Sequence, residues 1–208
     1  MKTPPEDRKS RLLHAAQALF AERPFDAVSM ADIADRAGVA FGLVAHHFGS
    51  KRGVYLAALS AMADDLRAAR DRPLDDGDLA TSLRQAIARH IAYLQEREPG
   101  FRAVMRGGIG ADPEARQIVE ALRWEGAQQL LQKLGVNTPM RPALHAAMHG
   151  WVGYLDESVL AWLDDPKLPR KHLAELAVSA LIASLKTVAC IDAACGIKAD
   201  LLARLEDG

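Results

Sequence analysis

Hydrophobic side chains recur every three or four residues along most of the chain, which is the period of an α-helix. The Val/Ile/Thr-rich alternation typical of strands is absent, whereas Ala and Leu recur at helical spacing. Prolines and glycines divide this pattern into about ten predicted helices, near 6–22, 29–38, 40–46, 51–70, 79–98, 101–108, 113–134, 140–164, 170–190 and 197–206. The sequence therefore predicts an all-α fold without internal repeats.

Two short helices near the N-terminus are joined by a tight turn. Ser29 and Asp32 are spaced as a capping box at the start of the first, and Gly38 ends it. Two such helices joined at a glycine are typical of a helix-turn-helix unit, whose second helix enters the DNA major groove. Ser50 is expected to cap the long helix that follows. The predicted domains are 1–56 and 57–208, with DRPLDDGD (71–78) as the plausible linker.

Charge and cysteine content narrow the class of protein. The net charge of −1 argues against a binder that covers nucleic acid with its whole surface, but residues 1–56 alone carry a net charge of +2. Cys190 and Cys195 lack disulfide or metal-site partners in sequence, which indicates structural thiols in a reducing cytosol. The N-terminus lacks the apolar core of a secretory signal, and the most apolar segment, 176–185, is shorter than the ~20 residues that cross a bilayer. We therefore expect a soluble, cytoplasmic protein.

The segment GLVAHHFGSK (42–51) combines two histidines with a Gly-Ser-Lys. Neighbours on a helix point about 100° apart, so His46 and His47 cannot both face one metal ion. Ser50 and Lys51 begin a helix whose free N–H groups and dipole favour an anion. No Gly-x-x-x-x-Gly-Lys precedes them, which excludes a nucleotide-binding P-loop. The alternatives to a phosphate contact are a solvated Lys51 and a structural His47. Phe48 is expected in the core.

Residues 15–59 resemble the N-terminal domain of the tetracycline-repressor (TetR/AcrR) family of transcriptional regulators. The matching elements are Ala16, Leu19-Phe20, Phe25, Val28-Ser29-Met30, Ile33-Ala34, Ala37-Gly38-Val39, Gly42, His47-Phe48, Ser50-Lys51 and Leu56. The resemblance implies a three-helix helix-turn-helix DNA-binding domain at 1–56, joined by a long helix to a larger ligand-binding and dimerisation bundle at 57–208. It also implies a homodimer, most often a repressor, that binds a palindromic double-stranded DNA operator and is released by a small molecule.

The resemblance places His47 and Lys51 at the family's phosphate-contacting positions. Ala45 stands where the family commonly has a tyrosine, Ala40 where it often has Ser or Thr, and Pro24 where a glycine usually follows the first helix. The candidate DNA-binding residues are Ser29, Ala40, Phe41, Leu43, Ala45, His46, His47 and Lys51. The outward face of the recognition helix is predicted to be apolar, with His46 as its only good hydrogen-bonding group. Specificity is therefore expected to depend on DNA shape and positioning.

Two further features of the N-terminal region keep two interpretations each. Arg8, Lys9 and Arg11 are plausible partners of the DNA backbone or simply a solvated basic terminus. Gly42 indicates a close approach of the backbone, either to DNA or to a neighbouring helix.

The C-terminal helices carry candidate dimer and ligand residues. Apolar stripes at Leu144, Met148, Trp151, Leu155 and Val159, and at Leu173, Ala177, Ala180, Leu181, Ser184 and Val188, predict either a dimer interface or the monomer core. The candidate ligand-binding residues, each of which could instead be core, are Tyr93, Phe101, Met105, Trp124, His149, Trp151 and Tyr154. His145, His149 and Asp156 leave open a zinc site, a polar ligand contact or a dimer rim. The glycine-rich loop 106–113 could admit a ligand.

No nucleophile–base constellation or cofactor motif is present in the sequence, which predicts neither an enzyme nor a bound cofactor or metal. Besides a DNA-binding regulator, the substitutions at Ala40 and Ala45 leave one alternative. That alternative is a protein of the same fold that acts through protein partners, with reduced DNA specificity.

Overall fold

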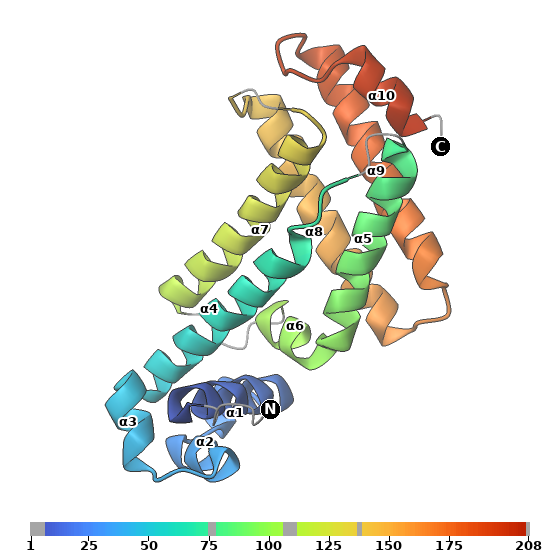
Figure 1. The fold of residues 1–208 in the computed structure, drawn as a ribbon. Helices are drawn as coiled ribbons and strands as arrows, with labels where there is room; N and C mark the ends of the chain where they lie inside the picture. Colours follow the sequence, from blue (N-terminus) through green and yellow to red (C-terminus); the bar gives the residue numbers. More distant parts are fainter. Residues whose placement is uncertain (1–6, 75–77, 106–111, 137–138, 207–208) are drawn as a thin grey trace, which may run out of the picture. The chain divides into compact units, whose positions relative to one another are not determined.

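The computed structural model describes residues 7–74, 78–105, 112–136 and 139–206. Its described part is helical, with no strand, which confirms the all-α prediction (Figure 1). The elements are α1 (Arg8–Glu22), η1 (Phe25–Ala27), α2 (Met30–Ala37), α3 (Gly42–Phe48), α4 (Lys51–Arg70), α5 (Leu79–Glu96), α6 (Glu98–Met105), α7 (Pro113–Lys133), α8 (Pro142–Asp164), α9 (Arg170–Ile191) and α10 (Ala199–Glu206). The glycine-rich loop falls largely on residues 106–111, outside the described part.

The first helices begin and end at the predicted signals. Ser29 Oγ accepts a hydrogen bond from the Asp32 N–H at 3.0 Å, and the Asp32 carboxylate accepts one from the Ser29 N–H at 2.8 Å, which completes the capping box of α2. Gly38 ends α2 in the left-handed conformation (φ 63°). Pro24 cannot adopt that conformation. Accordingly, α1 ends at Arg23 in extended backbone, and η1 begins after the proline.

The chain forms two compact units. The first comprises residues 1–66 and 97–121, and the second comprises 67–96 and 122–208. The sequence was predicted to divide once, after residue 56. In the structure, α6 and the first part of α7 also belong to the first unit. A single chain position therefore does not separate the two units.

The core of the first unit is formed mainly by α1 to α4. Leu12, Ile33, Val44 and Val54 are completely buried in it. At one side of this core, the rings of Phe20, Phe25 and Tyr55 pack together with centroids 4.9 to 5.8 Å apart. This packing fixes α3 through Val44 and fixes the start of α4 through Val54 and Tyr55.

In the second unit, α9 packs against α5 and α8. The apolar stripes predicted for a dimer are largely buried there within the single chain, including Leu144, Met148 and Val159 of α8 and Leu173, Ala177 and Leu181 of α9. The alternative interpretation, that these stripes close the monomer core, therefore describes the structure. A second copy would have to use the opposite faces of these helices.

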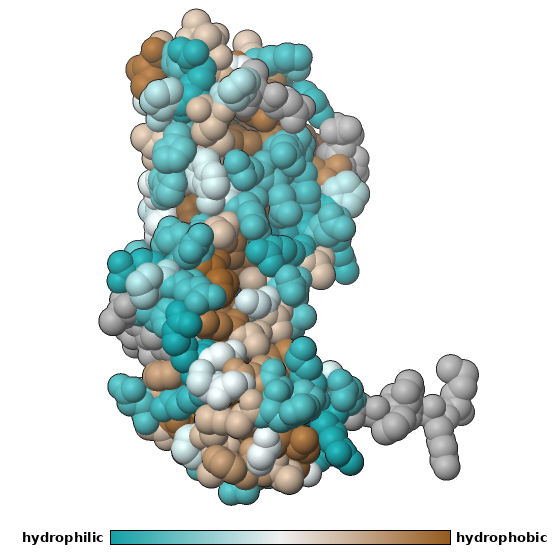
Figure 2. Space-filling view, turned by 90° about the vertical axis from the view of Figure 1, so that its left-hand side faces the viewer, coloured by the Kyte–Doolittle hydropathy of each residue, from teal (hydrophilic) through white to brown (hydrophobic). Residues whose placement is uncertain are grey.

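The surface of the protein is mixed in polarity. Hydrophilic residues cover most of the face shown in Figure 2, and hydrophobic residues reach the surface between them. Among the described residues, α9 is long and apolar enough to span a bilayer by length and composition, with a mean hydropathy of 1.7 over its best window. One face of α9 is nevertheless buried against its neighbours in the second unit, as in the core helix of a helical bundle.

Candidate nucleic-acid interface

The recognition helix α3 is anchored by one face and exposed on the other. Val44 is completely buried, and Leu43 and Phe48 are half-buried against the core of the first unit. Ala40, Phe41, Ala45 and His46 are exposed, and Phe41 is 58% exposed. The exposed ring of Phe41 is an apolar group of the kind that can contact thymine methyl groups in the major groove.

Leu43 lies differently from its neighbours. It was predicted on the outward face, but part of its side chain packs against the hydrophobic core. The physical reason is the helical period, which places Leu43 about 200° around the helix axis from Phe41. Its exposed portion is consequently smaller than that of Phe41.

The two histidines occupy different environments. His46 is exposed and His47 is half-buried between His46 and Phe48, with ring centroids at 5.1 and 6.2 Å. The rings of His46 and His47 are inclined by 69°. No group of three or more His, Cys, Asp and Glu side chains that could hold a metal ion occurs in the described residues.

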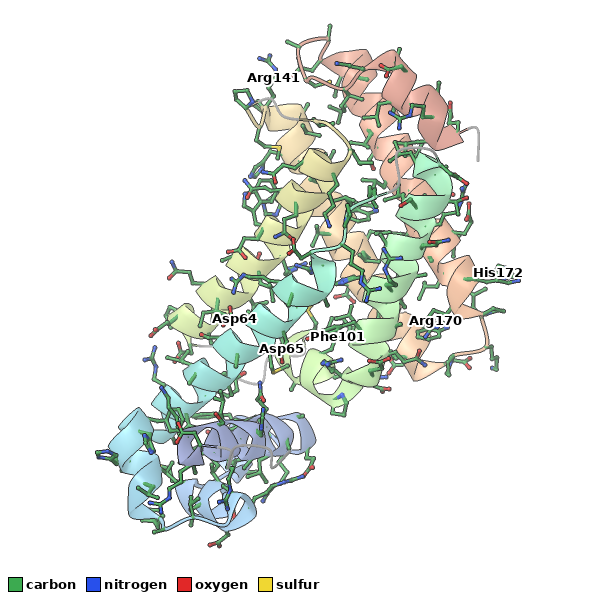
Figure 3. All side chains as sticks on the ribbon, viewed as in Figure 1. Asp64, Asp65, Phe101, Arg141, Arg170 and His172 are labelled. Carbon is green, nitrogen blue, oxygen red and sulfur yellow. The ribbon has the colours of Figure 1, made fainter. Side chains whose placement is uncertain are left out.

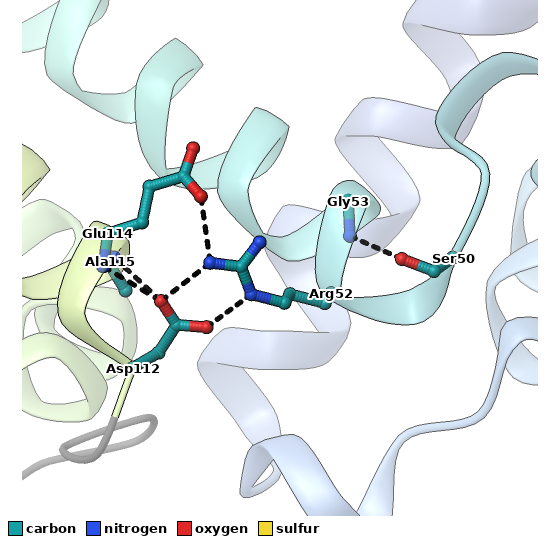
Figure 4. A network of polar contacts seen from close by, with 6 residues as sticks. All are labelled: Ser50, Arg52, Gly53, Asp112, Glu114 and Ala115. Atoms are coloured by element: carbon teal, nitrogen blue, oxygen red, sulfur yellow. Dashed lines mark hydrogen bonds and ion pairs between the residues drawn. The ribbon is translucent and has the colours of Figure 1, made fainter.

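Lys51 begins α4 in a defined position. Its Nζ lies 4.3 Å from the centre of the Phe25 ring and 3.4 Å from the Asp26 carbonyl oxygen. Ser50 caps the same helix end, because its Oγ accepts a hydrogen bond from the Gly53 N–H at 3.1 Å (Figure 4). Lys51 forms no ion pair with any described carboxylate. Its ammonium group is therefore held at a helix N-terminus with donors left for an anion.

The adjacent Arg52 is engaged by carboxylates. Its guanidinium donates two hydrogen bonds to Asp112, at 2.6 and 3.0 Å, and one to Glu114 at 2.8 Å (Figure 4). Asp112 also accepts from the N–H groups of Glu114 and Ala115, so it caps α7. The hydrogen bonds from Arg52 hold the pKa of Asp112 below its usual value. The helix start at Pro113 could be predicted from the sequence, but the role of Arg52 could not, because Asp112 lies 60 residues away along the chain.

Arg11 has a structural role that neither sequence interpretation anticipated. Its guanidinium donates to the carbonyl oxygens of Ala37 and Gly38, the latter at 2.9 Å. These carbonyls end α2, so the arginine ties α1 to the turn before the recognition helix. Arg8 and Lys9 are exposed.

Gly42 is the first residue of α3, and its surroundings are empty. A Cβ atom at this position would meet no other heavy atom within 4 Å, and its φ is not in the left-handed region. Close packing of a neighbouring helix therefore does not explain the glycine in this structure.

The candidate ligand-binding residues do not form one group. Trp124 stacks on His149, with centroids 4.7 Å apart and planes inclined by 17°, and His145 lies beside both rings. Trp151 is buried, and its indole N–H donates to the Ala177 carbonyl at 2.8 Å. Tyr93 is half-buried on α5, and Tyr154 is exposed on α8. Phe101, labelled in Figure 3, and Met105 belong to α6 in the first unit.

A small three-helix core, a turn at Gly38 and a short second helix with an exposed face define a helix-turn-helix protein of the DNA-binding class. The profile described as "Bacterial regulatory proteins, tetR family" matches residues 12–58, and "Tetracyclin repressor-like, C-terminal domain" matches residues 79–184. The chain belongs to the TetR family of bacterial transcriptional regulators.

Known proteins similar to the chain include a transcriptional activator and a transcriptional repressor. The transcriptional activator FasR of Mycolicibacterium smegmatis is 31% identical over 57% of this chain. The transcriptional repressor KstR2 of Rhodococcus jostii is 41% identical over 32% of it. The matched regions span about half of FasR and about a third of KstR2.

A crystal structure of a tetR-family regulator from Streptomyces coelicolor is similar over nearly the whole fold. It is 30% identical, covers 99% of this chain and 90% of its own, and has a TM-score of 0.82. The likeness therefore includes the C-terminal helices.

Proposed function

We propose that the chain is a homodimeric, ligand-responsive transcriptional regulator that represses from a palindromic operator and is released by a small molecule bound in the second unit. The observation that carries the DNA-binding part is α3, which Val44 anchors in the core while Phe41, Ala45 and His46 remain exposed. The family supports the rest, because TetR-family regulators bind DNA and typically act as dimers with small-molecule effectors. The activator FasR among the relatives makes activation the outcome to test against repression.

The proposed contacts divide into two kinds. Lys51, His47 and Ser29 contact phosphates, since they lie at the ends of helices near the exposed face of α3. Ala40, Phe41 and Ala45 contact thymine methyl groups, and His46 supplies the hydrogen bond to a base edge. Leu43 contributes with the exposed part of its side chain.

The dimer is proposed to form through the outward faces of α8 and α9. Gly150 and Gly153 lie within α8, and a Cβ atom at either position would meet nothing within 4 Å. A glycine inside a helix costs about 1 kcal/mol relative to alanine, and nothing in the single chain requires it at these two positions. On α9, Leu176 is 51% exposed, and the small residues Ser179, Ala183 and Thr187 are exposed as well. Close packing against a second copy explains both faces.

The DNA-binding proposal is tested by footprinting the purified protein upstream of its own gene at two salt concentrations. A protected, two-fold symmetric site whose affinity falls with salt is expected. Lys51→Ala should weaken binding to all sequences and reduce the salt slope by about one phosphate contact, whereas His46→Ala should relax sequence preference. The exposed Lys198 of the second unit supplies the charge-matched control, Lys198→Ala. An unchanged salt slope in Lys51→Ala would remove Lys51 from the interface.

The apolar face of α3 keeps one second candidate function. Ala40 and Ala45 offer no hydrogen bond to a base edge, and such a face also suits a protein partner. The absence of protection on the upstream DNA and on genomic fragments, at either salt concentration, would favour this function.

A further inference from the structure

The second unit contains a group of charged residues in which two pairs are complete and one arginine is left over. Arg67 pairs with Glu125 through two hydrogen bonds at 2.7 and 3.2 Å. Arg123 pairs with Asp156 at 2.8 Å, and Asp156 is only 7% exposed. Arg70, the last residue of α4, forms no ion pair with any carboxylate among the described residues. The group therefore carries one positive charge without a direct counterion.

The guanidinium of Arg70 is held against the backbone of α7. One of its nitrogens donates to the Leu122 carbonyl at 3.0 Å. Gly126 leaves room for it, since a Cβ atom there would come within 2.5 Å of Arg70 Nη1. Burial lowers the pKa of Arg70, and the negative charge of Asp156 acts in the opposite direction without touching it. The position of the guanidinium is thus fixed, while most of its five N–H donors have no protein acceptor in the described part of the chain.

His90 of α5 is a second polar group without a partner. Its Nδ1 is inaccessible to solvent and has no hydrogen-bond partner among the described residues. Burial lowers the pKa of His90 to about 3, and the positive charge of Arg70 adds to this effect. Buried polar groups in folded proteins are almost always hydrogen-bonded. The second unit therefore holds two polar groups, the Arg70 guanidinium and His90 Nδ1, whose hydrogen-bonding capacity the described residues do not fill, and the charge of Arg70 acts on His90.

We propose that Arg70 and His90 bind the carboxylate of a small-molecule effector, with one oxygen on the guanidinium and the other accepting a hydrogen bond from His90 Nδ1–H. The planar guanidinium matches a carboxylate in shape. A carboxylate is favoured over a doubly charged phosphate, because a single uncompensated positive charge and a neutral imidazole balance a single negative charge. The role of this acid as effector rests on the proposed function, whereas the binding site itself does not.

The competing explanation is that Arg70 stabilises the fold through the Leu122 carbonyl and the field of Asp156. The two explanations predict opposite effects of Arg70→Met on the ligand-free protein. A binding arginine without a counterion opposes folding, so its replacement by an apolar side chain of similar length should leave Tm unchanged or raise it. A structural arginine should lower Tm on replacement. Arg123→Met is the matched control, and it should lower Tm because it leaves the buried Asp156 unpaired.

The binding experiment uses straight-chain acids from acetate to decanoate, each with the alcohol of the same length as the neutral control. At least one acid should raise Tm of the wild-type protein and bind measurably by calorimetry, and its alcohol should do neither. Arg70→Met should weaken that acid at least tenfold, and His90→Phe should weaken it by a smaller factor. Alkyl phosphates of the same lengths separate the two head groups.

Several outcomes would overturn the assignment. They are a failure of every acid to bind, equal binding by Arg70→Met and wild type, tighter binding of the phosphates, or a lowered Tm in ligand-free Arg70→Met. Operator binding by the same variants, with and without the acid, separates this inference from the proposed function. Intact DNA binding with no acid site overturns only the inference, and an Arg70-dependent acid site in a protein that binds no DNA overturns only the proposed function.

Discussion

The two units use the same kinds of charged residue under opposite physical conditions. In the first unit, the ion pair of Arg36 and Glu22, at 2.6 Å, lies at the surface, and the ion pair of Arg52 and Asp112 joins an exposed arginine to a half-buried carboxylate. Hydrogen bonds from the arginines lower the pKa values of Glu22 and Asp112. The charged forms of these carboxyl groups are favoured there, so the ion pairs hold helix ends in place.

In the second unit, burial has the larger effect. It raises the pKa of Asp156, even though Arg123 opposes the change, and it lowers the pKa values of His90 and Arg70. Here the charged forms are disfavoured, and the charged form of Asp156 depends on the hydrogen bond that Arg123 donates to it. An arginine–carboxylate pair is therefore a minor contact at the surface of the first unit and a requirement of the fold in the interior of the second.

The largest expected effect is that of breaking the buried pair. Asp156→Ala should lower the free energy of unfolding by about 3 kcal/mol, because it removes the buried carboxylate to which Arg123 donates a hydrogen bond. Glu22→Ala, which breaks an exposed pair with Arg36, is the matched control and should have a much smaller effect. Urea denaturation of the two variants measures both changes. Equal losses would show that burial does not distinguish the two units.

The next effect is a pH dependence that belongs to His90. Its pKa is about 3 in the folded chain against an ordinary value of 6.5, so the unfolded chain takes up a proton in this range and the folded chain does not. The contribution of His90 to stability is therefore complete above pH 6.5 and is lost as the pH falls, by about 1.4 kcal/mol per pH unit. The raised pKa of Asp156 works in the opposite direction, because the folded chain takes up that proton first.

Comparison of wild type with His90→Phe separates the pH dependence of stability due to His90 from that due to Asp156. Denaturation midpoints between pH 5 and 7 should fall with acidification in the wild type, and the slope should be reduced in the variant. His172 points away from α9 and is exposed, so His172→Phe serves as the control (Figure 3). Identical slopes in all three proteins would show that His90 is not held neutral in the folded state.

The sequence predicted well those features that depend on neighbouring residues. The capping box of Ser29 and Asp32 and the end of α2 at Gly38 both follow from local backbone chemistry. Features that depend on distant residues were not predicted. Arg11 at the end of α2, Arg52 on Asp112 and Arg70 beside Leu122 join positions 26 to 60 residues apart. Periodicity found the apolar stripes of α8 and α9 but could not tell a stripe buried in one chain from one buried between two chains.

Each unit contains one residue whose free-energy cost is not offset by a contact in the described part of the chain. In the second unit that residue is Arg70, which has no ion-pair partner in the described part of the chain, and in the first it is Gly42, where a Cβ atom would meet no other heavy atom within 4 Å. A helical glycine with open space around it should accept a side chain, so Gly42→Ala should preserve the fold and stabilise it by up to about 1 kcal/mol. If the glycine serves close approach to DNA, the same variant should bind the operator more weakly.

The matched variant in the first unit is Gly53→Ala. A Cβ atom at Gly53 would lie 2.1 Å from the Phe48 carbonyl oxygen, so the backbone that ends α3 must shift, with an expected loss of about 1 to 3 kcal/mol. Thermal denaturation and operator titration of the two variants together separate a packing glycine from a binding one. We expect Gly53→Ala to lose stability, and Gly42→Ala to lose operator affinity while it keeps its stability. This result would show that Gly42 serves DNA binding and Gly53 serves packing. Full operator affinity in Gly42→Ala would show that the backbone of α3 does not approach DNA at that residue.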